Sequence, residues 1–132
     1  LIQSLLTVKS NLDSGVPQAI QHMGIEALKK SSEFLEENNA IYERRRNKLV
    51  KALIEIGLEV PIPKAGLYLW CKIPDGYTSA QFTELLLEKC DVVVTPGTGY
   101  GSFGEGFVRL SLTTPDHLVD EGVKRISKWN SG

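Results

Sequence analysis

The segment Phe107-Val108-Arg109-Leu110-Ser111-Leu112 is the stretch that best indicates the fold. If it is a strand, its two-residue period puts Val108, Leu110 and Leu112 on one face, which we expect to pack under helices. Arg109 then points to the opposite face. The pattern alone favours a solvated arginine there. The alternative is a planar donor aimed into a cleft, because a guanidinium matches a carboxylate bidentately.

Upstream of this strand, the spacing of apolar residues changes from helical to alternating. A helical pattern runs over residues 32–56 and stops at Gly57, where a helix C-terminal glycine belongs. Residues 58–63 carry two prolines, so we expect an edge strand or an irregular lead-in. Residues 67–73 alternate as a strand, and the residues on one of its faces are Leu67, Leu69, Cys71 and Ile73.

The remaining elements lie on either side of residues 107–112. Residues 78–81 are a plausible capping box that opens a helix, and residues 92–94 are a short apolar run that predicts a strand. Thr114 and Pro115 begin a final helix. The inward residues of that helix are expected to be Leu118, Val119, Val123 and Ile126.

The order of these elements predicts an α+β fold. We expect a small, mainly antiparallel sheet that is covered by helices on one face and preceded by a long helix. Before the long helix, the first residues fit a helix, residues 11–17 form a break, and a second helix follows.

Composition limits the classes of function. The chain has 132 residues, of which 42% are hydrophobic and 23% charged, as in a globular protein with one core. Its net charge of -1 argues against nucleic acid or an anionic membrane as an obligatory partner. No stretch is long and apolar enough for a membrane span, and we expect no signal peptide. The basic run at residues 44–46 is expected to be a solvated face or an interdomain ion-pair site.

The cysteines and histidines show no metal-binding spacing. Cys71 and Cys90 form no C-x-x-C pair, and we expect buried, reduced thiols in a cytoplasmic protein. His22 and His117 have no partner at ligand spacing. The sequence therefore predicts no zinc site.

A glycine-rich loop at residues 95–106 contains a G-x-G-x-x-G match at Gly99, Gly101 and Gly104. A dinucleotide-binding fingerprint requires a helix to follow, and here a strand follows. A kinase-type loop would need further motifs that the chain lacks. We therefore expect glycines that permit positive φ in a hairpin-like connection whose backbone packs closely against something.

Other side chains give little indication of catalysis. Tyr68 and Trp70 alternate with apolar residues in a predicted strand, so core or interface packing is expected rather than a ligand cage. No G-x-S-x-G element is present, and neither histidine has an obvious nucleophile beside it.

Four segments, in order along the chain, resemble the C-terminal part of the class I/II aminotransferases of fold type I. The resemblance covers nearly the whole chain and is strongest to the subgroup that contains LL-diaminopimelate aminotransferases. Residues 107–112 are similar to the family's [VI]-R-[IL]-[SA] strand, and residues 63–70 to its P-x-G-x-[FY]-[LI]-W element. Residues 94–97 followed by 101–104 are similar to its V-x-P-G-x-x-F-G element, with a longer glycine-rich insertion. Residues 9–15 are similar to the segment after its cofactor lysine.

The resemblance implies a parent enzyme that uses pyridoxal 5'-phosphate. That parent would be a cytoplasmic homodimer, the small domain of fold type I would be its C-terminal part, and its substrates would be an α-amino acid and a 2-oxo acid. Diaminopimelate or lysine biosynthesis is the implied branch. Arg109 matches the arginine that binds the substrate α-carboxylate, and Asn11 matches an asparagine near the active site.

The same resemblance implies a division of the chain. Residues 1–31 would be a remnant of the large cofactor-binding domain, residues 32–57 the long interdomain helix, and residues 58–132 the small domain. The chain starts at Leu1 without an initiator methionine, inside a helical pattern, so we expect a cut into a longer protein.

Several parts of the family's active site have no match in this chain. The Schiff-base lysine of the family lies in an S-x-[SA]-K-type segment, and Ser127-Lys128 does not match that context. We therefore predict no catalytic residue, no cofactor-binding residue and no metal ligand in this chain. The chain alone is expected to be inactive, because pyridoxal phosphate would have neither tether nor base.

Two other functions stay open. The first is non-enzymatic, a stand-alone α+β module that senses small ligands or regulates through its sheet face. The second is a nucleotide-binding domain that uses the glycine-rich loop.

Overall fold

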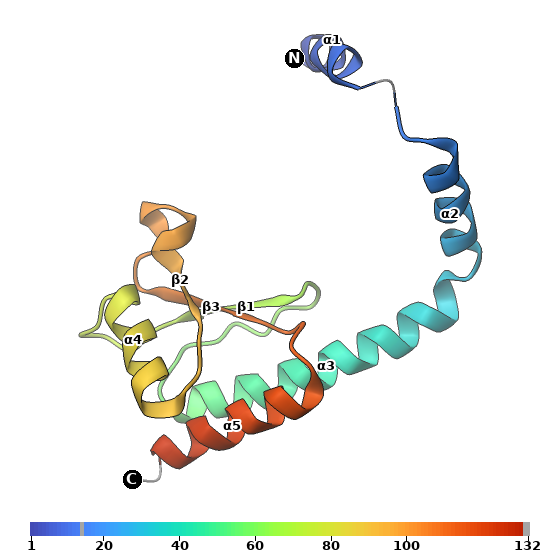
Figure 1. Cartoon of the computed structure of the whole chain (residues 1–132). Coiled ribbons are helices and arrows are strands. Elements are labelled where there is room, and N and C mark those ends of the chain that lie inside the picture. The colour runs from blue at the N-terminus through green and yellow to red at the C-terminus, as the bar shows by residue number, and fades with distance from the viewer. Residues whose placement is uncertain (14, 131–132) are drawn as a thin grey trace. The chain divides into compact units, whose positions relative to one another are not determined.

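The computed structural model describes residues 1–13 and 15–130, which form two compact units. The first unit is Leu1–Asn38 and the second is Asn39–Gly132. The elements of the first are α1 (Ile2–Leu12), α2 (Gln18–Lys29) and the beginning of α3 (Ser31–Glu55). The rest of α3 and all later elements belong to the second unit (Figure 1).

Helices α1 and α2 have no buried residue. Their apolar side chains are open to solvent, with Leu12 at 79% and Leu28 at 78% exposure. The predicted break is confirmed, because α1 ends at Leu12 and α2 begins after Pro17. This unit therefore has helical structure among its described residues without a core of its own.

Helix α3 ends as the sequence predicts. Gly57 has φ 88°, the amide of Gly57 donates to the carbonyl of Ile54, and the amide of Leu58 donates to that of Leu53. This pair of bonds is a Schellman motif, which needs a left-handed residue after the helix and is most easily made by glycine. The motif turns the chain from α3 into the lead-in to the sheet, where Glu59 bridges Lys72.

The sheet has three antiparallel strands in the order β1-β3-β2. Strand β1 is Tyr68–Lys72, β2 is Thr95–Pro96 and β3 is Phe107–Ser111. The predicted α+β fold with a small antiparallel sheet is confirmed. The central strand is β3, and Arg109 in its middle pairs with Trp70 on one side and Thr95 on the other.

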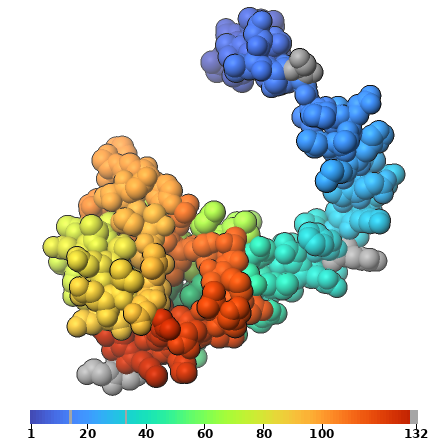
Figure 2. All heavy atoms as spheres, in the orientation of Figure 1, coloured from blue at the N-terminus to red at the C-terminus, as the bar shows by residue number. Residues whose placement is uncertain are grey.

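One face of the sheet packs against helices. The central buried residues of β1 and β3 alternate along each strand, as predicted. They join a core with residues of α3, α4 (Ser79–Cys90) and α5 (Asp116–Asn130). Figures 1 and 2 show α5 lying along the second half of α3. The sheet residues of this core are Leu69, Cys71, Val108 and Leu110.

Three sequence predictions about these elements are wrong. Residues 92–94 form no strand, and pairing with β3 begins only at Thr95. Val94 is buried and Val93 is 78% exposed, so the alternation expected of a strand is present without a ladder of backbone hydrogen bonds. Leu67 lies before β1 at 39% exposure, and Leu118 lies in the first turn of α5 at 52% exposure, so neither faces the core.

Candidate functional site

Arg109 lies on the sheet face opposite the helices. Its neighbours Val108 and Leu110 are buried in the core, so the pleat directs the Arg109 side chain away from it. The residue is half-buried in the middle of the central strand. Both flanking strands therefore border the guanidinium.

Two tyrosine rings contact this guanidinium. The central carbon of the Arg109 guanidinium lies 4.2 Å from the ring centroid of Tyr68 and 4.5 Å from that of Tyr100. Cation–π contacts of this kind are attractive because the face of an aromatic ring is electron-rich. Tyr68 and Trp70 are 46% and 37% exposed, so of the expected core or interface packing the core alternative is wrong and interface packing stays a prediction.

Further rings extend this cluster over the open face. Trp70 meets Tyr100 edge-on at 5.8 Å and stacks on Phe107 at 5.6 Å. We call Tyr68, Trp70, Tyr100 and Phe107 the aromatic face. It surrounds one positive charge with apolar, weakly hydrated surface, where a bound anion would interact more strongly than in open water.

Arg109 is also the arginine without an anionic partner in the part of the chain that the structure describes. Arg44 and Arg45 pair with Asp116 at 2.6 and 2.5 Å, and Arg45 also donates to the carbonyl of Leu112 at 3.0 Å. Those hydrogen bonds from Arg45 and Arg44 lower the pKa of Asp116. The basic run thus joins α3 to α5 by ion pairs.

Arg46 and Arg125 also form ion pairs. Arg46 contacts Glu43 at 2.8 Å and donates to the carbonyl of Pro63 at 3.1 Å. Arg125 contacts Glu121 at 2.9 Å and Asp91 at 3.6 Å. Among the contacts of the described residues, only Arg109 is an arginine whose N–H groups stay available for an external carboxylate.

The glycine-rich loop consists of two 3₁₀ turns, η1 (Gly97–Tyr100) and η2 (Ser102–Gly104). A Cβ added to Gly97 would overlap the carbonyl oxygen of Gly104, and one added to Gly104 would overlap that of Gly97. The two turns therefore pack backbone to backbone. The expected close approach is confirmed, and its partner is the loop itself.

A buried serine fixes this loop to α4, and the sequence did not single it out. The Ser79 hydroxyl accepts hydrogen bonds from the amides of Gly106 at 2.9 Å and Phe107 at 3.2 Å, and donates to the carbonyl of Gly104 at 3.3 Å. A Glu105 carboxylate oxygen accepts from the Ser79 amide at 2.7 Å, which lowers the pKa of Glu105. The predicted capping box of Thr78 and Gln81 is confirmed beside it.

The second candidate residue, Asn11, lies in the first unit. Its side-chain amide donates to the carbonyl of Thr7 at 2.8 Å in exposed surroundings. That contact is a local one within α1.

The described residues do not by themselves fit pyridoxal phosphate. Lys72, on the same face of β1 as Trp70, is bound to Glu59 at 3.3 Å and is exposed. The backbone of the glycine-rich loop packs on itself, and the arginine beside it is flanked by rings. Among the described residues of the second unit, Lys72 and the glycine-rich loop therefore supply neither an unpaired lysine nor an open phosphate cradle for this cofactor.

The cysteines of the second unit are not placed as nucleophiles or metal ligands. Cys71 and Cys90 are buried free thiols, as expected, and burial raises the pKa of Cys71 to about 12. Among residues 1–13 and 15–130, no cluster of His, Cys, Asp or Glu could hold a metal ion. The same described residues include no helix that could cross a membrane.

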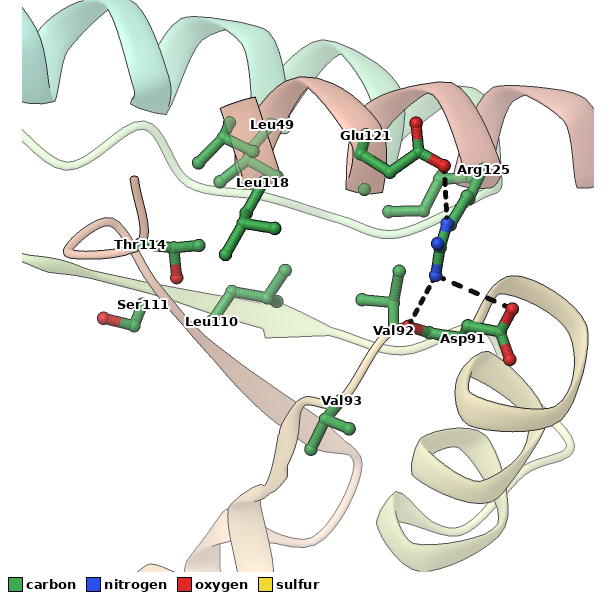
Figure 3. A pocket seen from close by; sticks show the side chains of 13 residues that line it. Leu49, Asp91, Val92, Val93, Leu110, Ser111, Thr114, Leu118, Glu121 and Arg125 are labelled. Carbon is green, nitrogen blue, oxygen red and sulfur yellow. Dashed lines mark hydrogen bonds and ion pairs between the residues drawn. The ribbon is translucent and has the colours of Figure 1, made fainter. Parts of the chain in front are cut away.

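A separate cleft of about 290 Å³ lies between α5 and the end of α4 (Figure 3). Its floor is apolar, with Leu49, Leu110 and Leu118 among its lining residues. At its edge, Arg125 bonds Glu121 and Asp91. Because two carboxylates contact this one guanidinium, Arg125 is not available to an anionic ligand in the cleft.

Comparisons with known proteins agree on one family. The profile described as "Aminotransferase class I and II" matches residues 1–126. A protein named LL-diaminopimelate aminotransferase from Dehalococcoides mccartyi is 54% identical over 131 residues, which is 99% of this chain and 34% of that protein. Another of that name from Moorella thermoacetica is 42% identical over 97% of this chain and 33% of that protein.

Solved structures give the same result for the fold. A probable N-succinyldiaminopimelate aminotransferase from Thermus thermophilus aligns with a TM-score of 0.82 at 33% identity, over 97% of this chain and 34% of that one. The L,L-diaminopimelate aminotransferase from Chlamydomonas reinhardtii aligns with a TM-score of 0.77 at 32% identity, over 92% and 30%. This chain thus spans about a third of the length of these relatives.

Proposed function

The chain belongs to the class I and II aminotransferases, and we propose that in the whole protein Arg109 binds the α-carboxylate of the substrate. The observation that supports this most directly is an arginine on the open sheet face, half-buried, flanked by rings and without an anionic partner among the described residues. A guanidinium in that state can donate two parallel hydrogen bonds to one carboxylate.

The proposed activity of the whole protein is transfer of an amino group from an α-amino acid to a 2-oxo acid. The names of the relatives support diaminopimelate as the substrate class. Bound pyridoxal phosphate would supply the aldehyde that takes up the amino group. We place that cofactor in the whole protein, which we propose to be a cytoplasmic homodimer. Asn11 is proposed as a weaker contributor near the site.

The role of Arg109 in this activity is to bind and orient. Two hydrogen bonds to the carboxylate fix the position and plane of that group, which restricts the orientations in which the α-carbon can bind. The aromatic face reduces the water around the ion pair, which strengthens it.

The test is Arg109→Lys in the complete enzyme. Lysine keeps the charge and loses the bidentate geometry, so we expect KM for the amino acid to rise about tenfold or more and kcat to fall less. Arg44→Lys is the matched control, since Arg44 is exposed and pairs with Asp116. An unchanged KM in Arg109→Lys would remove this residue from carboxylate binding.

The chain by itself is proposed to be inactive. Pyridoxal phosphate with borohydride should then label its surface lysines without saturation. Saturable labelling of one lysine would mean that the chain holds a cofactor site of its own.

A further inference from the structure

We infer that Tyr68 and Tyr100 are positioning residues that hold the Arg109 guanidinium in the orientation that meets the substrate carboxylate. This inference rests on the proposed function, since it concerns the same site. It assigns a role to two side chains that the strand pattern alone had indicated only as packing residues or, for Tyr100, as part of a loop.

The two rings approach Arg109 from opposite sides of the central strand. Tyr68 lies on β1, and Tyr100 ends the turn η1 that follows β2. Strands β1 and β2 pair with β3 on its two edges. The guanidinium therefore contacts one ring carried by β1, at 4.2 Å, and one ring carried by the turn after β2, at 4.5 Å.

These contacts leave the hydrogen-bonding groups of Arg109 unused. A cation–π contact pairs the positive charge with the face of the ring and uses no oxygen acceptor, so the five N–H groups of the guanidinium can still donate to a carboxylate. No hydrogen bond of Arg109 to another described side chain competes with a ligand. Two ring contacts can thus fix the plane of the guanidinium while its donor fork stays open.

Both rings are themselves held in place. Trp70 meets the Tyr100 ring edge-on at 5.8 Å and is stacked on Phe107. The turn that carries Tyr100 is fixed by the contact between Gly97 and Gly104. Tyr68 follows Leu67, whose carbonyl accepts from the amide of Leu112 at 2.8 Å. The aromatic face is therefore a support built from both strands and the loop.

Such a support matters because arginine is long and flexible. A free side chain with several rotatable bonds loses rotamer freedom when a ligand fixes it, and that loss weakens binding. A side chain that is already held loses less. The rings should therefore act on substrate affinity more than on the chemical step.

The test uses leucine and phenylalanine variants of the complete enzyme. In Tyr100→Leu and Tyr68→Leu the ring face is lost, and we expect KM for the amino acid to rise about three- to tenfold with kcat changed less than about twofold. Tyr100→Phe and Tyr68→Phe keep the ring face and should restore KM to near the wild-type value. Tyr77→Leu is the matched control, because Tyr77 is also 46% exposed and contacts Phe82 instead of Arg109.

The outcomes separate this inference from the proposed function. If Arg109→Lys leaves KM unchanged, the proposed function fails and the inference with it. If Arg109→Lys raises KM while both leucine variants match Tyr77→Leu, the inference alone is overturned. Phenylalanine variants as impaired as the leucine ones would also overturn it, because the hydroxyls and not the ring faces would then matter.

A double-mutant cycle adds a readout that general damage to the fold would not move. Tyr100→Leu in an Arg109→Lys background should raise KM by clearly less than it does alone, since the guanidinium it positions is gone. Additive effects would contradict the inference. Thermal melts show whether each variant folds. If Tyr100→Leu does not fold, Tyr68→Leu, Tyr68→Phe and the double-mutant cycle of Tyr68→Leu with Arg109→Lys test the inference.

Discussion

At the scale of single residues, the contact between Gly97 and Gly104 allows a direct test of the loop. Each glycine occupies the space where the Cβ of the other would lie, and the obstacle in both cases is backbone. Backbone cannot move aside as the end of a flexible side chain can. The two positions should therefore tolerate no side chain without a shift of both turns.

We predict that Gly97→Ala destabilises the protein by about 2 kcal/mol or more, because overpacking forces backbone displacement. The control is Gly99→Ala in the same turn, where an added Cβ would meet only the Thr95 methyl at 3.8 Å. Urea unfolding of both variants measures the difference. Equal stability of the two variants would mean that the close approach is absent in solution.

Sequence reasoning found Arg109 and missed what surrounds it. The two-residue period of β3 was enough to direct its side chain away from the core. For Tyr68, strand alternation indicates only a packing role, because it gives no information about contacts across strands. Tyr100 could not be placed, since the conformation of a glycine-rich loop depends on the contact between Gly97 and Gly104, and no periodic pattern encodes that contact.

At the scale of elements, ion pairs connect α3 to α5. Asp116 in the first turn of α5 pairs with Arg44 and Arg45, and Asp120 one turn later pairs with Lys48. Spacing within α5 would offer Asp120 a partner in Lys124, four residues further along the same helix. Lys48 on the neighbouring helix takes that place, because a contact between helices cannot be read from spacing within one.

These ion pairs give stability a pH dependence. Hydrogen bonds from Arg45 and Arg44 lower the pKa of Asp116 below its ordinary value of 3.8. A carboxylate with a lowered folded-state pKa stabilises the folded state above its unfolded pKa, and this contribution is lost as the pH falls through the folded pKa. We therefore expect Asp116→Asn to lower stability near neutral pH and to lose less stability than the wild type on acidification below 3.8.

Unfolding by urea at a series of pH values measures this effect, with the exposed Asp75→Asn as the control. Parallel stability curves for Asp116→Asn and the wild type would contradict it. The size of the effect should be modest, because the Asp116 side chain is 44% exposed and water screens the pair.

Element boundaries were predictable where local chemistry sets them. The Gly57 motif ends α3, and Thr78 with Gln81 caps α4, because both signals act within a few residues. Residues 92–94 show the limit of such reasoning. Their alternation gives an extended segment, but a strand also needs a neighbour to pair with, and that depends on the rest of the fold.

At the scale of the whole molecule, the two units differ in how much they bury. The core residues all lie in the second unit, whereas α1 and α2 have none. Helices without tertiary burial are marginal in water at 11 and 12 residues. The isolated chain should therefore be stable in only one of its units.

Hydrogen exchange of the isolated chain tests this difference. Amides of β1, β3 and α4 should be protected in proportion to global stability, while amides of α1 and α2 should exchange with little protection. Comparable protection in both units would show that the first unit is stabilised by contacts that its exposed side chains do not account for. The division of the chain into 1–31, 32–57 and 58–132 stays a prediction, and the same measurement bears on its first boundary.

The extended run at residues 92–94 has a practical consequence for handling this chain. It is a short valine segment outside the ladders of the sheet, with the Val93 side chain in water. Segments of high strand propensity without a charge or a proline are templates for pairing with copies of themselves. Asp91 and Pro96 lie on either side of this run and act as gatekeepers, so replacing both with valine is expected to make concentrated samples of the isolated chain self-associate.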